Sequence, residues 1–163
     1  MQVRAFLSDS VQSADGKLYV QGAGWNRLAA GGFPARHDRV GIGIVLTIDA
    51  AATREHNLEI SLLDDKEQPV TLFTDAAGVE QFAINASFQT EAVEGDFKEV
   101  SVPFALNIDG IVFPAPGTYA VSIRVDGADT ERLNFRVDLM AGATGQAGPP
   151  STSTGRAGEA GYL

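Results

Sequence analysis

The sequence contains no cysteine, which excludes disulfide bonds, a thiol nucleophile and thiolate metal sites. Its two histidines, His37 and His56, show no spacing that would join them to carboxylates as ligands of one metal ion. Aspartates crowd the predicted turns, but no Asp-x-Asp-x-Asp-Gly loop of a calcium site occurs, and aspartate is also an ordinary turn residue. We therefore expect no metal and no other cofactor.

Positive charge is also scarce, because 12 Lys and Arg stand against 21 Asp and Glu, for a net charge of −9. Binding to nucleic acid or to anionic membranes needs clustered Lys and Arg, so neither is an expected partner. No apolar run approaches the roughly 20 residues of a transmembrane helix. The first residues lack the apolar segment of a signal peptide, and we expect a cytoplasmic protein.

The strongest pattern lies in residues 116–139. Apolar residues occupy every second position from Tyr119 to Val125 and from Leu133 to Leu139, and residues 126–129 supply turn chemistry between the two runs. Successive side chains of a strand point to opposite faces. The segment therefore predicts an antiparallel hairpin with one apolar face, which includes Ile123 and Phe135 and must be buried against a second sheet.

The same alternation recurs along the chain, and no window shows a sustained helical period. Further strands are predicted at residues 3–8, 17–21, 39–49, 57–63, 70–73, 81–88, 100–108 and 111–113. Residues 29–38 are predicted as a loop, Asp109-Gly110 as a turn, and residues 50–54 as the one place for a short helix. Short strands at this spacing predict an all-β fold, a single antiparallel β-sandwich of immunoglobulin-like or related topology over residues 1–140.

Two features refine the predicted strands. Pro103 lacks a backbone N–H, so its strand is expected at a sheet edge or with a bulge. Gly41 and Gly43 lie on the outer face of the strand at residues 39–49, where glycine indicates that a loop or a partner packs closely.

The composition changes after Met140. Residues 141–163 are almost wholly Gly, Ala, Ser, Thr and Pro, which predicts a flexible C-terminal tail. Tyr162 and Leu163 are its only large apolar residues, and we single them out as candidate interaction residues.

Evidence for catalysis is missing from the sequence. There is no Gly-x-Ser-x-Gly nucleophile elbow, and Gly22-Ala23-Gly24 is not followed by the third glycine and helix of a dinucleotide-binding loop. We predict that the protein is not an enzyme and assign no catalytic residue. Trp25 and Phe33 remain as candidate interaction residues, and with Tyr19 they could form an aromatic platform for a sugar, although Trp25 is more readily explained as a core residue.

Two functions stay open. The first is a structural or protein-interaction domain that binds a partner or itself through an edge strand or through the glycine-lined face of residues 39–49, with the tail as a tether. The second is a ligand-binding module, with carbohydrate as the favoured ligand.

Several short segments occur in an order that is similar to one protein family. They are Ser8-Asp9-Ser10-Val11, residues 15–20 (DGKLYV), Gly22-x-Gly24-Trp25, Phe33-Pro34, His56-x-Leu58-Glu59-Ile60-x-Leu62-x-Asp64 and Pro116-x-Thr118-Tyr119. The chain resembles, over about residues 3–140, small bacterial proteins of the DUF6941 type, which are frequent in actinobacteria. The resemblance implies a compact β-sandwich and carries no activity or catalytic residue to this chain.

Overall fold

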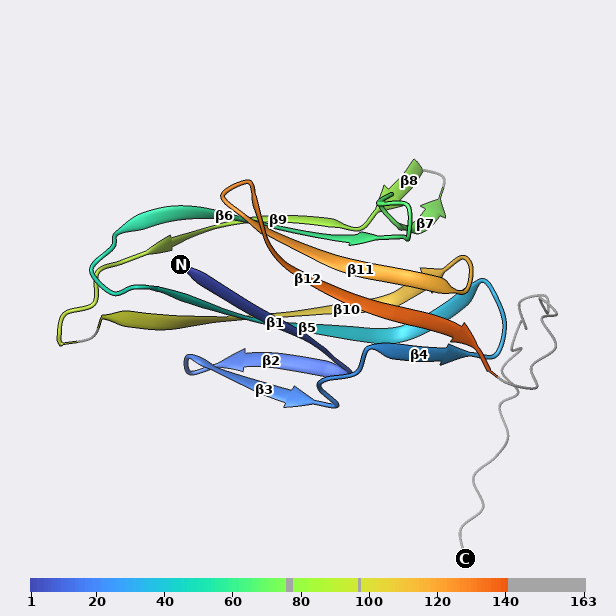
Figure 1. Cartoon of the computed structure of the whole chain (residues 1–163), viewed down its shortest axis with the longest axis horizontal. Helices are drawn as coiled ribbons and strands as arrows, with labels where there is room; N and C mark the ends of the chain where they lie inside the picture. The colour runs from blue at the N-terminus through green and yellow to red at the C-terminus, as the bar shows by residue number, and fades with distance from the viewer. Residues whose placement is uncertain (76–77, 97, 141–163) are drawn as a thin grey trace, which may run out of the picture.

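The computed structural model describes residues 1–75, 78–96 and 98–140, which form strands and no helix (Figure 1). Within this part of the chain there is accordingly no helix that could span a membrane. The strands are β1 (Gln2–Ser8), β2 (Ser10–Ala14), β3 (Lys17–Gln21), β4 (Arg27–Ala30), β5 (Ala35–Asp49), β6 (Arg54–Leu63), β7 (Thr71–Asp75), β8 (Gly78–Gln81), β9 (Ala83–Thr90), β10 (Glu99–Phe113), β11 (Gly117–Val125) and β12 (Ala128–Leu139).

Two sheets make up the body of the molecule. One has three strands in the order β1-β5-β10, and the other has five strands in the order β4-β12-β11-β6-β9. The pairs β2-β3 and β7-β8 form separate two-stranded sheets, and the pairings are antiparallel except for the parallel pair β4-β12. The predicted all-β sandwich is confirmed, while its assignment to an immunoglobulin-like topology stays a prediction.

The core forms where the apolar faces of the two sheets meet. Ile42, Ile44 and Leu46 of β5 are completely buried, and Ile123 of β11 and Phe135 of β12 lie in the same apolar cluster. These are the faces that the alternation predicts, so the register of the central strands could be read from the sequence.

Two hairpins turn on Asp-Gly pairs. Asp15 and Gly16 have φ values of 51° and 69°, and Asp126 and Gly127 have φ values of 53° and 77°. Positive φ at both central residues is typical of the two-residue turn that matches the twist of an antiparallel hairpin. The second turn is shorter than predicted, because β12 begins at Ala128.

The predicted loop at residues 29–38 is wrong. β4 extends to Ala30 and β5 begins at Ala35, so the connection is residues 31–34 with a cis Phe33–Pro34 peptide bond. β4 is held by parallel pairing with β12, and the backbone N–H of Met140 donates to the carbonyl of Ala30 over 2.8 Å. This long-range pairing leaves no local signal in the sequence.

The predicted turn at Asp109-Gly110 is also wrong. β10 continues to Phe113, because β5 is long enough to pair with it on both sides of Gly110. Gly110 has a φ of 70°, and the ion pair of Arg39 with Asp109, at 2.6 Å, joins the two strands beside it.

The short helix predicted at residues 50–54 is absent from the described chain. Ala50 and Ala51 form a turn, in which the backbone N–H of Ala51 donates to the Asp49 carboxylate over 2.9 Å. The Asp49 side chain thus replaces the helical hydrogen bond with a local turn.

Pro103 and the two glycines lie where the sequence indicates. β10 is an outer strand of its sheet, as the proline predicts. An added Cβ at Gly43 would enter the ring of Phe6, and one at Gly41 would meet Ser8 and Ser10. The close approach is therefore made by β1 and β2 of the same chain, and the glycine-lined face is not left free for a partner at these positions.

Candidate functional site

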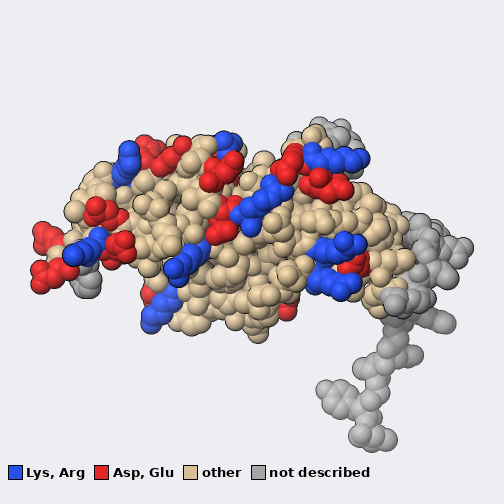
Figure 2. Space-filling model, viewed as in Figure 1, with Lys and Arg blue, Asp and Glu red and all other residues tan. Residues whose placement is uncertain are grey.

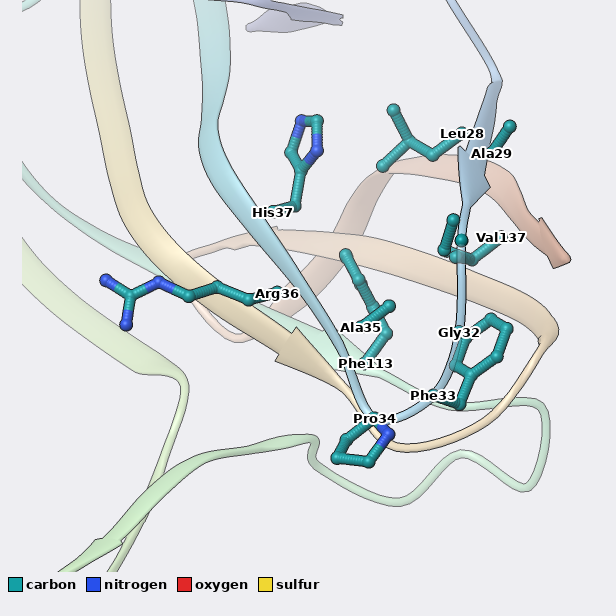
Figure 3. A pocket seen from close by; sticks show the side chains of 12 residues that line it. Leu28, Ala29, Gly32, Phe33, Pro34, Ala35, Arg36, His37, Phe113 and Val137 are labelled. Carbon is teal, nitrogen blue, oxygen red and sulfur yellow. The ribbon is translucent and has the colours of Figure 1, made fainter. Parts of the chain in front are cut away.

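A pocket of about 520 Å³ lies at the end of the sandwich where β4 turns into β5 (Figure 3). Its lining residues come from β4, the turn, β5, β10 and β12, and most of them are apolar in type. The lining residues with side chains beyond glycine and alanine are Leu28, Phe33, Pro34, Arg36, His37, Phe113 and Val137. Its volume is within the usual range of small-molecule sites, but few polar side chains are available to orient a ligand.

The two predicted aromatic residues have different positions at this end of the sandwich. Phe33 lines the pocket, whereas Trp25 is half-buried and packs edge-on against Phe135, with ring centroids 5.9 Å apart. Trp25 also contacts His37 with a centroid distance of 6.4 Å, so the imidazole links it to the pocket wall. Tyr19 lies on β3 of a separate hairpin with 54% of its surface exposed. The three aromatic residues therefore do not form one platform.

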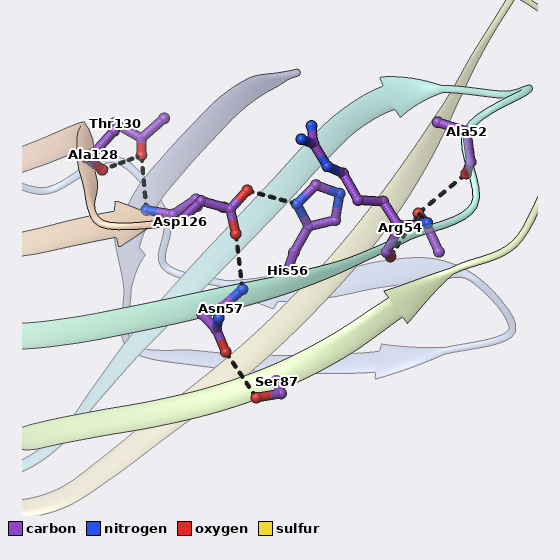
Figure 4. A network of polar contacts seen from close by, with 10 residues as sticks. Ala52, Arg54, His56, Asn57, Ser87, Asp126, Ala128 and Thr130 are labelled. Carbon is purple, nitrogen blue, oxygen red and sulfur yellow. Dashed lines mark hydrogen bonds and ion pairs between the residues drawn. The ribbon is translucent and has the colours of Figure 1, made fainter.

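The other histidine belongs to a polar network between β6 and the β11-β12 turn (Figure 4). His56 is buried, and its Nδ1 lies 2.8 Å from Oδ2 of Asp126. The backbone N–H of Asn57 donates to Oδ1 of the same carboxylate over 3.0 Å. This hydrogen bond and the contact with His56 lower the pKa of Asp126 below its ordinary value.

The network joins β6 to the β11-β12 turn, and its described hydroxyls are not placed for nucleophilic catalysis. The neighbouring hydroxyls bond elsewhere, since Ser87 donates to Oδ1 of Asn57 over 2.9 Å and Thr90 contacts the carbonyls of Ala52 and Arg54. A His-carboxylate pair activates a hydroxyl only when that hydroxyl is within hydrogen-bond reach of the imidazole. This network has no local signal in the sequence, because the contact of His56 with Asp126 joins residues 70 positions apart.

His37 and His56 do not lie together as ligands of one metal ion. His37 lies on β5 and His56 on β6, in different sheets. Across residues 1–75, 78–96 and 98–140, no three His, Asp or Glu side chains are grouped to hold a metal ion.

The outer face of the five-stranded sheet carries interleaved charges (Figure 2). Arg27 and Arg136 both contact Asp138 at 2.6 Å, and Arg132 contacts Glu67 at 2.7 Å. The hydrogen bond from Arg136 is the main reason why the pKa of Asp138 is lowered. Because these charges are paired, the face does not offer a binding surface of one sign.

A different kind of surface lies between β9 and β10, the outer strands of the two sheets on one side of the sandwich. Phe88 of β9 packs against Phe104 of β10 with ring centroids 5.0 Å apart. Several of the apolar side chains on these two strands are only partly buried, although each points toward the core: Ile84, Phe88, Val100, Val102, Phe104 and Leu106. We call this surface, together with Ala86, the open side; Ala86 is exposed between Ile84 and Phe88.

The contrast with the neighbouring strand shows what the open side lacks. Ile44 and Leu46 of β5, the ladder partners of Phe104 and Val102, have no exposed surface. They are covered from both sides by strands, whereas β9 and β10 each have a strand on one side only. Incomplete burial at the open side follows from this position in the sheets.

The last two predicted interaction residues, Tyr162 and Leu163, lie outside the described residues, as does the whole predicted tail. The open side was not singled out in the sequence. Its signal was present in β9, where the segment AINASFQT contains no charged residue, no proline and no glycine.

The sequence matches a family model over most of its length. A family model described as "Family of unknown function (DUF6941)" covers residues 3–138. No curated protein matches the sequence.

Solved structures resemble the fold at a low level, with TM-scores of 0.35. One is the Pseudomonas fluorescens alkylpurine DNA glycosylase AlkC bound to DNA containing an abasic site analog, at 14% identity over 69% of this chain and 28% of that chain. Two are glycosyl hydrolase family 2 members from Bacteroides cellulosilyticus, at 13% and 12% identity over 61% and 82% of this chain. This chain spans 12% and 25% of those two proteins, and the likeness carries no argument about function.

Proposed function

We propose that this chain, which belongs to the DUF6941 family of unknown function, is a non-catalytic protein-interaction domain that binds through its open side. The observation that carries the proposal is the partly exposed row of apolar side chains on β9 and β10, beside two sheet edges. A partner can bind such a surface by adding one of its own strands to the exposed sheet edge and packing its side chains against the apolar row.

Strand addition would use both parts of this surface. The outer edge of β9 supplies backbone N–H and C=O groups that are directed away from β6. The side chains of Phe88 and Phe104 would lose their remaining contact with water, which contributes at most about 1 kcal/mol for each of these partly buried rings. Hydrogen bonds would set the register, and the apolar side chains would provide affinity.

In the described network no hydroxyl is placed for activation by His56 and Asp126, and this supports a non-catalytic role. The carboxylate of Asp126 is occupied by Asn57 and His56, and the hydroxyls of Ser87 and Thr90 are directed to other partners. A cytoplasmic location and the lack of nucleic-acid or membrane partners stay predictions from the sequence.

The test compares tagged wild-type protein with two variants in the native host. Ala86→Lys places a charge on the open side, and Tyr19→Lys adds the same charge at an exposed position on β3. We expect polypeptides that co-purify with the wild type to be lost from Ala86→Lys and retained by Tyr19→Lys. Retention of the same polypeptides by all three proteins would contradict the proposal.

A carbohydrate-binding module is the second candidate, and the pocket at the β4-β5 turn is the observation that favours it. Trp25 contacts His37 in the pocket wall, so its fluorescence should respond when the pocket is filled. A saturable change with a glycan panel that disappears in Phe33→Ala would support this function. An unchanged signal across the panel would exclude the pocket as a glycan site.

A further inference from the structure

We infer that β9 pairs with β9 of a second copy of this chain, antiparallel and centred on Ala86. The inference rests on the proposed interaction function and names its partner. It would join the two five-stranded sheets edge to edge, with the two copies related by a two-fold axis.

Among the outer strands of the two main sheets, β9 has the least protection against such pairing. Its eight residues, AINASFQT, are uncharged and lack proline. The other outer strands of these two sheets carry features that oppose edge-to-edge contact: Pro103 in β10, Arg4 in β1, and Arg27 in the four-residue β4. Charged residues, proline and short length are the usual means of protecting a sheet edge.

β10 is further hindered by the β2-β3 hairpin. The side-chain amide of Asn107 donates to the carbonyl of Val11 over 2.7 Å and accepts the backbone N–H of Val11 over 3.0 Å. The hairpin is thereby held across β10. β9 has no such described contact, since its partner in the sheet order is β6 alone.

Charge favours β9 as the place where two copies approach. Each copy has a net charge of −9, so most faces repel their counterparts. β9 itself is neutral, and Glu59, which lies opposite Asn85 on β6, forms an ion pair with Arg124 at 3.2 Å. No charge on β9 itself therefore opposes its counterpart in the second copy.

The residue pattern of β9 is complementary to itself. Ile84, Ala86 and Phe88 point toward the core, and Asn85 and Ser87 point outward. When two copies pair antiparallel about Ala86, Ile84 lies opposite Phe88 of the second copy and Asn85 lies opposite Ser87. A shift by one residue would place Ile84 opposite Gln89 and would put apolar and polar side chains on the same face.

Because the chain has no cysteine, single substitutions test this register directly. Opposite residues of an antiparallel pair have Cα atoms about 4.5–5.5 Å apart, and a disulfide bond spans about 4.4–6.8 Å. Ala86→Cys should therefore cross-link to the same residue of the second copy under mild oxidation. Ala83→Cys is the matched control, because its counterpart would lie about 20 Å away at the strand rise of roughly 3.4 Å per residue.

We expect Ala86→Cys to form a covalent dimer at least about tenfold faster than Ala83→Cys at equal low micromolar concentration. Both alanines are exposed on β9, so thiol accessibility does not distinguish them. Equal rates would overturn the inference whether or not the protein self-associates.

Sedimentation velocity over a concentration series supplies an independent readout. Wild type and Ala83→Lys should associate with the same affinity, whereas Ala86→Lys, which sets two lysines opposite each other, should remain monomeric. A wild type that stays monomeric throughout, or a dimer lost on truncation after Met140, would overturn the inference. In either case the proposed function survives if Ala86→Lys still loses the other proteins that co-purify with the wild type. If Ala86→Lys does not fold, the cross-linking rates of the two cysteine variants decide whether β9 pairs with itself.

Discussion

Phe6 packs over Gly43, and this contact leads to a prediction about Gly43→Ala. Its effect on the free energy of unfolding should change sign when Phe6 is also replaced by alanine. Phe6 and Gly43 are ladder partners on the outer face of the three-stranded sheet. A Cβ added at Gly43 would lie inside the van der Waals surface of the ring, so Gly43→Ala forces Phe6 to move outward. Insertion of a carbon into an occupied space costs about 1–3 kcal/mol.

An opposing term comes from the unfolded chain. Alanine in a strand is favoured over glycine by about 0.5–1 kcal/mol, because glycine loses more backbone freedom on folding. For Gly43→Ala alone, the overpacking term exceeds this gain, and we expect a net loss of about 1–2 kcal/mol in the free energy of unfolding. In a Phe6→Ala background the obstruction is gone, and the same change should stabilise the protein by about 0.5 kcal/mol.

Urea unfolding of the four proteins in this double-mutant cycle measures both values. Gly32→Ala is the control, because an added Cβ there meets no atom within 4 Å. If Gly43→Ala costs the same with and without the Phe6 ring, the reasoning from ring contact is refuted.

Three further predictions concern the core, the polar network and the tail. Ile123→Ala should cost about 2–5 kcal/mol in urea melts because the side chain is fully buried, whereas Arg124→Ala on the outer face should cost about 0.5–1 kcal/mol; equal losses would contradict the register. The lowered pKa of Asp126 stabilises the fold above the unfolded-state pKa of about 4, and this contribution is lost as the pH falls through the folded-state pKa. The stability difference between wild type and Asp126→Asn should therefore vanish in acid, and a difference that persists at the lowest pH would argue against the assignment. Deletion of residues 141–163 should leave the melting temperature unchanged, and a lower value would show that the tail contributes to the domain.

The sandwich could be predicted from the sequence because the alternation that identifies its strands lies within each strand. Alternation in β5, β11 and β12 identifies strands and their buried faces, since a side chain's face depends only on its position along the strand. The turns at Asp15-Gly16 and Asp126-Gly127 and the edge position of Pro103 were equally accessible, because backbone freedom and a missing N–H act within one or two residues.

The candidate sites depended on contacts that the sequence does not specify. Phe33 was identified as a candidate, but the pocket it lines exists only because β4 pairs in parallel with β12 and closes against the start of β5. The contact of His56 with Asp126 likewise joins distant segments. Neither contact produces a periodic signal, and each depends on how the two sheets meet.

The sequence by itself determined that this chain is all-β, which side chains face the core, and where its main hairpins turn. Apart from β10, which its proline marks, only the tertiary structure decided which strands became outer strands, because sheet order depends on the summed packing of all strands and not on the pattern within any one. β9 reads as an ordinary strand in the sequence, and only its place beside β6, with no strand beyond it in the described chain, makes its uncharged edge available to a second molecule.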